Sequence, residues 1–294
     1  MHTKHRWLGF LIALTMVIGF IPAAVFAQDP APAYAYIPNM GDASVSKVDL
    51  SAETPSVVAR YYTAPLLDAS GVWGDLFGSA AGDLTAIAPV GWRTSRIAID
   101  QDGNAWTINT GADSGSATVQ GSIARVQFDV SGLTNTSTAA ADIKTFGTDE
   151  AVDVFPVGDR GDCPRCVNFD AAGNLWIGFH KAYEKYGYFQ KYVFDGTNLT
   201  ATGDRIYGST SFVEGSQDPV PAFDIAPYNA DIDANGVLWF VSYGSSRVNR
   251  NGGTYGATNG VYSFDTDATD PKSTFVRHEE SGPTGADMGY MKSG

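Results

Sequence analysis

The chain has little of what most catalytic and metal centres are made from. It has two cysteines and four histidines, and two of the histidines, His2 and His5, stand at its very start. Only His180 and His278 remain for the rest of the sequence. A histidine-based metal cluster or a serine–histidine–aspartate triad is therefore poorly supplied, and we expect no metal ion and no organic cofactor.

Positive charge is also scarce. The 19 Lys and Arg residues face 32 Asp and Glu residues, which gives a net charge of −13. Because nucleic acids are held by clustered basic side chains, this balance argues against a nucleic-acid partner. The 26 Asp far outnumber the 6 Glu, which favours turns over helices, and no stretch shows the apolar 3.6-residue period of a helix. With 33 Gly, the composition predicts an all-β fold of many short strands.

The first 27 residues are typical of a secretory signal peptide. A basic start precedes an apolar run, Leu8–Ile21, that is short for a membrane span, and residues 25–27 suit cleavage before Gln28. An uncleaved N-terminal anchor is the alternative. No second apolar stretch of spanning length follows. We therefore expect residues 28–294 to be secreted, in an extracellular, cell-surface or periplasmic location, with no membrane span.

Three segments, 97–108, 167–178 and 230–241, align without gaps. In each, an alternating apolar arm leads into the pattern Asp-x-x-Gly-x-x-Trp. The pattern residues are Asp100, Gly103 and Trp106, then Asp170, Gly173 and Trp176, then Asp233, Gly236 and Trp239. This pattern predicts a recurring β-hairpin. The Asp accepts backbone N–H groups in the turn, the Gly adopts a positive φ, and the Trp buries its ring with its N–H bonded at an edge.

A second marker follows each hairpin. Alternating runs end at Phe128-Asp129, Phe194-Asp195 and Phe264-Asp265, and Val48-Asp49 is a similar pair near the start. A further strand is expected after each marker, for example at 56–62 and 143–146. The segment 28–294 then divides into four units of about four strands, at 30–92, 93–160, 161–222 and 223–281, with 282–294 leading into another. The wide Trp spacing predicts long loops at 66–92, 147–165 and 208–228.

These features resemble β-propeller repeats. Residues 36–49 are similar to the opening of a YVTN-type repeat, and the Asp-x-x-Gly-Asn-Leu-Trp hairpins resemble blades of NHL, streptogramin-lyase-like and two-component-regulator propellers. The resemblance implies a β-propeller of four-stranded antiparallel blades. A β-sandwich would not naturally repeat one hairpin at near-regular spacing. Four units are fewer than the six to eight usual in that group, so either the blades are irregular or the chain is a truncated propeller. We favour truncation, since an open propeller leaves unpaired edges.

Cys163 and Cys166 form the one local motif with chemical content. In an exported chain they predict a disulfide that pins the loop before the Asp170 hairpin. Structural zinc would need two further ligands, and c-type haem would need a histidine where Val167 stands. A redox-active pair activated by the adjacent Arg165 is a further alternative.

The arginines suggest a binding site. In propellers the loops that lead into the innermost strands gather at one end of the central channel. Arg93, Arg96, Arg165 and Tyr228 would then come from equivalent places in successive units, close to the two cysteines. They could form a cationic mouth for a uronic acid, another carboxylate or a phosphate. The alternative is that each arginine pairs with a nearby surface Asp.

Other candidate ligand contacts lie between residues 180 and 192. His180, Tyr183 and Tyr186 could contact a sugar or a protein, although His180 is more simply a strand-end residue. Alternation along a strand would place half of the aromatic residues of this segment in the core instead. The Asp-rich turns could bind calcium, but they match no known calcium loop, and turn chemistry explains them.

These observations favour a secreted or cell-surface, non-catalytic propeller module that binds a carbohydrate, protein or matrix ligand, with room for further C-terminal domains. One alternative is a propeller-type lyase or hydrolase acting on an extracellular substrate. Propeller lyases use histidines and a Glu on loops at one face, and His180 alone could match such a place. A second alternative is a periplasmic sensor or redox-partner domain, which would require solvent-accessible cysteines.

Overall fold

The computed structural model describes residues 33–40, 42–64, 93–110, 120–160, 162–180, 187–207, 225–242 and 260–278. The predicted signal peptide and most of the loops expected at 66–92 and 208–228 lie outside these ranges. The described residues form fifteen β-strands and one short 3-10 turn, Pro271–Thr274. The predicted all-β fold is confirmed.

The strands form four antiparallel sheets, each in sequence order. The first sheet contains β1 (Tyr34–Asn39), β2 (Ser44–Asp49) and β3 (Ser56–Tyr62). The second contains β4 (Arg93–Ile99), β5 (Ala105–Thr110), β6 (Gln120–Val126) and β7 (Val152–Arg160). The third contains β8 (Cys163–Phe169), β9 (Leu175–His180), β10 (Tyr188–Phe194) and β11 (Leu199–Ile206). The fourth contains β12 (Pro227–Ile232), β13 (Val237–Ser242), β14 (Gly260–Asp265) and β15 (Val276–His278).

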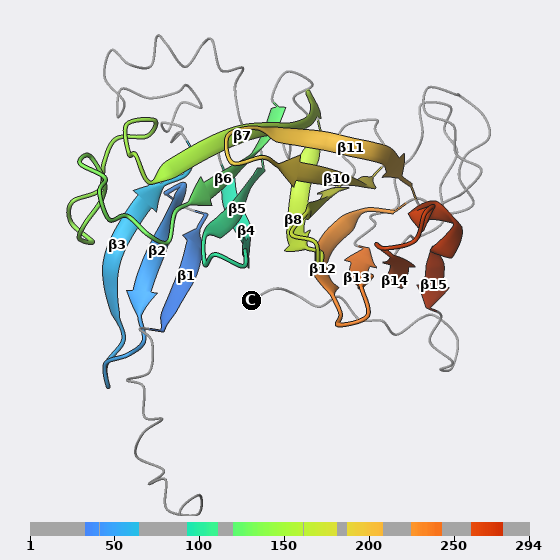
Figure 1. Ribbon diagram of the computed structural model, residues 1–294, viewed down its shortest axis with the longest axis horizontal. Helices are drawn as coiled ribbons and strands as arrows, with labels where there is room; N and C mark the ends of the chain where they lie inside the picture. The colour runs from blue at the N-terminus through green and yellow to red at the C-terminus, as the bar shows by residue number, and fades with distance from the viewer. Residues whose placement is uncertain are drawn as a thin grey trace, which may run out of the picture.

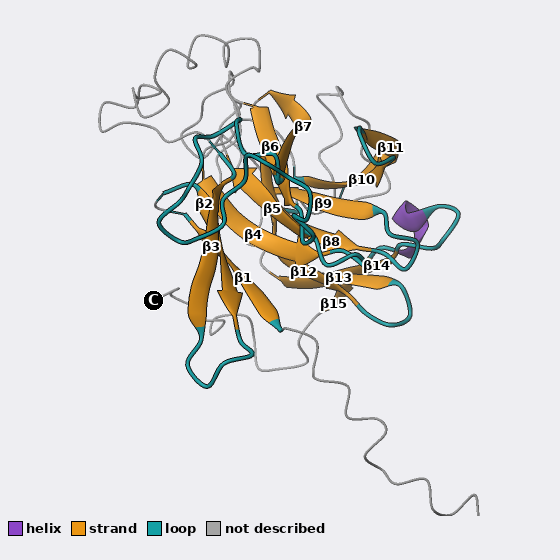
Figure 2. Cartoon of the chain, turned by 60° about the vertical axis from the view of Figure 1, so that its left-hand side comes forward, coloured by secondary structure: helices purple, strands orange, loops and turns teal. Residues whose placement is uncertain are grey.

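The four sheets follow one another in an arc, from β1–β3 at one end to β12–β15 at the other (Figure 1). The first strands β4, β8 and β12 pack side by side, so they form the inner edge of the arc. Figure 2 shows the sheets stacked face to face, with loops around their ends. A radial stack of antiparallel meanders is the architecture of a propeller. The sheets are β-propeller blades.

The core lies between the sheets and not within any one of them. Between the second and third sheets, Trp106 packs against Phe194 at 5.1 Å between ring centroids, and Phe155 of the same sheet as Trp106 stacks beside it at 5.9 Å. Between the third and fourth, Trp176 packs against Phe264 at 5.4 Å. A third cluster around Tyr61 joins the first sheet to the second. Each blade is therefore stabilised mainly by the blades beside it.

The hairpin motif is a local hydrogen-bonded unit. In all three copies one carboxylate oxygen of the Asp accepts backbone N–H groups of the turn, and the other accepts the indole N–H of the Trp six residues later. The Asp170–Trp176 bond is 3.2 Å long, and the turn glycine between them, Gly173, has a φ of +81°. Burial alone would raise the pKa of Asp170, but the hydrogen bonds from Asn174 and Trp176 hold it below its usual value. The predicted turn chemistry is confirmed.

The segment between β6 and β7 differs from the prediction. We expected a strand at 143–146 and a loop at 147–165, but 143–146 is loop, and 147–165 contains β7 and the start of β8. The pairing explains the difference: β7 pairs with β6 from Val126↔Val152 to Gln120↔Arg160. Residues 127–151 are therefore the long connection. The strand predicted at 56–62 is present as β3.

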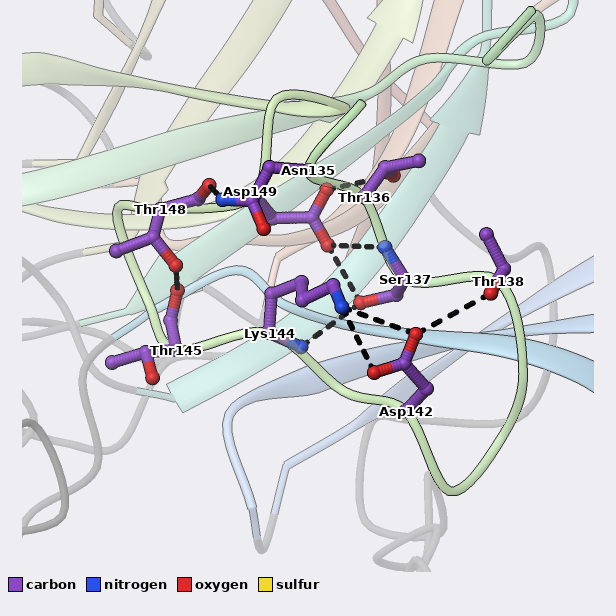
Figure 3. Close-up of polar contacts among 9 residues, drawn as sticks. All are labelled: Asn135, Thr136, Ser137, Thr138, Asp142, Lys144, Thr145, Thr148 and Asp149. Carbon is purple, nitrogen blue, oxygen red and sulfur yellow. Dashed lines mark hydrogen bonds and ion pairs between the residues drawn. The ribbon is translucent and has the colours of Figure 1, made fainter. Parts of the chain in front are cut away.

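Asp149 organises this long connection from within (Figure 3). It is only 5% exposed, and its carboxylate accepts the hydroxyls of Thr136 at 2.8 Å and Ser137 at 2.6 Å. The same carboxylate accepts the backbone N–H groups of Ser137 and Ala151. Further out, Asp142 forms an exposed pair with Lys144 at 2.9 Å. The buried carboxylate of Asp149 thus satisfies four donors of a connection that contains no strand.

Candidate functional site

The inner strands of three successive blades are irregular at the same place. The register of β4 shifts between Thr94 and Ile97, that of β8 between Pro164 and Cys166, and that of β12 between Pro227 and Asn229. The residues left out of the ladder are Ser95 and Arg96 on β4, Arg165 on β8 and Tyr228 on β12. A β-bulge re-aims the side chain of its extra residue, and bulges are frequent beside functional sites.

The re-aimed side chains meet. The guanidinium carbon of Arg96 lies 4.7 Å from the centre of the Tyr228 ring, and that of Arg165 lies 5.6 Å from it. Both distances are within the range of a cation–π contact. All three residues are half-buried. Arg96, Arg165 and Tyr228, which we call the inner cluster, therefore bring two positive charges and one aromatic ring together from three different blades.

Among the residues that the structure describes, no carboxylate forms an ion pair with Arg96, although acidic residues outnumber basic ones in the chain. The alternative of surface pairing with Asp therefore does not describe Arg96. Arg93 begins β4, but its side chain is not among those described.

The disulfide predicted between Cys163 and Cys166 is not present in the structure. Cys163 and Cys166 are thiols that are not joined by a disulfide, and each is 1% exposed. Both lie in strand β8, with the Arg165 bulge between them, and both are buried in the core. Burial raises the pKa of the Cys166 thiol to about 12, against opposing effects of the Gly178 backbone and Arg96. The accessible thiols required by the redox alternative are not present.

Both thiols should therefore be unreactive in the folded protein. We expect Ellman's reagent to modify Cys163 and Cys166 only after denaturation, because a buried, protonated thiol is a poor nucleophile. A reducing agent should leave Tm unchanged. An intact mass two hydrogens below that of the dithiol form would contradict this prediction and restore the disulfide.

Of the three remaining predicted contacts, the structure describes His180 alone. His180 ends β9, opposite Cys163 in the register, and Tyr183 and Tyr186 lie outside the described residues. Of the neighbouring aromatic residues, Tyr188, Phe189 and Tyr192 are core residues, no more than 4% exposed. For residues 188–192, the core interpretation therefore describes the aromatic side chains better than a recognition surface does.

The described part of the chain offers no evident metal centre. Within it, no three His, Cys, Asp or Glu side chains are grouped so that they could hold a metal ion. The turn carboxylates that we considered for calcium, Asp100 and Asp265, instead accept N–H groups of their own turns. Among the same residues, no helix is long and apolar enough to cross a membrane.

A cavity of about 230 Å³, which was not predicted from the sequence, lies between the third and fourth sheets. Trp176, Lys191, Thr202, Asp204 and Lys272 are among the residues that line it. Its two lysines already have acidic partners, since Lys191 lies 3.3 Å from Asp170 and Lys272 lies 2.6 Å from Asp204. The inner cluster is the better candidate site, because Arg96 has no such partner among the described residues.

Comparison with known proteins finds only distant structural similarity. No protein-family model and no curated protein matches the chain. A gluconolactonase from Xanthomonas campestris aligns at 12% identity and a TM-score of 0.41, over 83% of this chain and 57% of that one. A proposed gluconolactonase aligns at 11% identity and a TM-score of 0.31, over 79% of this chain and 86% of that one. A proposed glycosidase from Bacteroides thetaiotaomicron aligns at 12% identity and a TM-score of 0.34, over 84% of this chain and 72% of that one. The chain thus spans 57% of the first of these structures, and at such scores none carries an argument about activity.

Proposed function

We propose that this protein is an exported propeller module that binds an acidic sugar or a similar carboxylate ligand at the inner cluster. The observation that carries the proposal is the meeting of Arg96, Arg165 and Tyr228, each from the bulge of a different inner strand. Three side chains from three blades converge without forming part of the ladder. Such convergence of polar side chains is typical of binding sites.

The chemistry of the cluster fits a carboxylate. A guanidinium group can donate two parallel hydrogen bonds to one carboxylate, and two such groups can hold it from two sides. The Tyr228 ring supplies an aromatic surface of the kind that suits a sugar face. Because the protein as a whole is acidic, at −13, the attraction is local, and added salt should weaken it.

The Arg96→Ala substitution tests the proposal. It should weaken binding of trigalacturonate by about 10- to 100-fold, the effect of losing hydrogen bonds to a charged group. The ligand's fully methyl-esterified form, which has lost its charges, should bind weakly to both proteins. Isothermal titration calorimetry measures all four affinities.

Arg277→Ala is the matched control, because Arg277 is exposed on β15, away from the inner cluster. It removes the same charge and should leave the affinity unchanged. Equal losses in the two variants would mean that the arginines act only through net charge. Appearance of cleaved or ring-opened products in the titration cell would instead support the alternative, a hydrolase or lyase acting at this cluster.

A further inference from the structure

The last sheet leaves an apolar face open to solvent. Trp239 and Val241 on β13, Val261 on β14 and Val276 on β15 are 38–47% exposed. The register places Trp239 opposite Ser263 and Val241 opposite Val261, and pairs Ser263 with Val276, so these side chains share one face. We call this the forward face of the fourth sheet, where forward means the side on which the next sheet in chain order would pack and backward means the side of the preceding sheet.

The same face is covered in the sheets before it. Trp106 and Trp176 occupy the motif position of Trp239, yet they are 1% and 3% exposed. Phe194 of the third sheet covers Trp106, and Phe264 of the fourth covers Trp176. A forward face is therefore built to receive the next blade, and Trp239 is the motif tryptophan that no described blade covers.

The first sheet exposes apolar side chains on its backward face instead. Tyr36 and Tyr61 point forward into the cluster shared with the second sheet. Ile37 follows Tyr36 and so points backward, and Val57 lies backward beside Val48. Ile37 is 48% exposed and Val57 is 39% exposed. This backward face lies at the end of the arc opposite the fourth sheet (Figure 1).

One open face is thus forward and the other backward, the same two orientations that meet between successive sheets within the chain, although the backward face also carries Ser46 and Arg60. We propose that the forward face of β12–β15 receives the backward face of β1–β3 from a second copy of this chain. This contact would continue the sheet-on-sheet packing already present three times within one chain. Two arcs of four sheets would close into a ring of eight, which is within the size range of known propellers.

The pairing is head-to-tail, and that permits a complementation test. We expect the full chain to sediment as a dimer. Val241→Asp on the forward face, or Ile37→Asp on the backward face, buries an unpaired charge and should raise the dimer dissociation constant by about 100-fold or more. Both residues are exposed in the single chain, so neither change should prevent folding. Ile99→Asp, at a residue of β4 that is 49% exposed and belongs to neither face, is the control and should still dimerise.

A mixture of the two variants tests whether the pairing is head-to-tail. Each keeps one intact face, so a mixture of Val241→Asp and Ile37→Asp proteins should form heterodimers through one good contact, although neither protein dimerises alone. A wild-type chain that stays monomeric, with Trp239 fully quenched by acrylamide, would overturn the proposal and leave the forward face to a sheet from further sequence. Dimers disrupted by Val241→Asp but not by Ile37→Asp would overturn it in favour of pairing between two forward faces.

Discussion

Trp176→Ala should lower the free energy of unfolding by about 3–5 kcal/mol, the cost of truncating a large aromatic residue in a core. The ring is 3% exposed, packs against Phe264 and lies beneath the Lys191 ammonium. Its removal also leaves Asp170 without the indole N–H. Urea unfolding followed by circular dichroism measures the change.

Trp239→Ala is the matched control, because the residue has the same motif position and the same bond to its Asp, at 3.0 Å. It is 40% exposed, so its loss in a monomeric chain should cost only about 1 kcal/mol. The difference between the two values measures what the following blade contributes. A loss below about 1 kcal/mol at Trp176 would show that the described blade packing is wrong.

Asp149→Ala should destabilise the protein by about 2–4 kcal/mol, because it leaves buried donors of the β6–β7 connection without their charged acceptor. Thr136 and Ser137 lose hydroxyl partners, and the Ser137 and Ala151 amides lose backbone partners. The connection packs through Val130 and Leu133 against the cluster between the first and second sheets, so its loosening should extend to that core. Thermal unfolding detects the loss.

Asp142→Ala provides the comparison within the same connection. Asp142 is exposed and pairs with Lys144, an arrangement that contributes little in water. Its substitution should leave the unfolding free energy close to the wild-type value. Similar losses in the two variants would mean that the Asp149 network does not hold the connection.

The hairpins could be predicted from sequence because their chemistry is local. Asp170, Gly173 and Trp176 lie within seven residues, and every bond of the turn joins residues inside that span. The strand β7 could not be read in this way. Its pairing with β6 crosses a connection of 25 residues, 127–151, that is held largely by side-chain hydrogen bonds to the carboxylates of Asp149 and Glu150.

Part of the inner cluster could be predicted from the sequence. Counting five residues back from Asp100, Asp170 and Asp233 gives Ser95, Arg165 and Tyr228, the bulged positions of the three inner strands. Sequence alone could suggest that such residues gather, but not that a bulge turns them toward one another. The disulfide prediction was wrong for a related reason, since the spacing of Cys163 and Cys166 does not reveal that both lie buried in one bulged strand.

A residue at a bulge is released from a constraint that acts on the other residues of its strand. A residue within a strand must satisfy a ladder partner and a packing neighbour, so its identity is constrained twice. Arg165 and Tyr228 stand outside the ladder, and different side chains can occupy their positions without changing the register of β8 or β12. The blades can thus keep the same fold while the side chains at the bulged positions, one in each blade, are substituted to bind a different ligand.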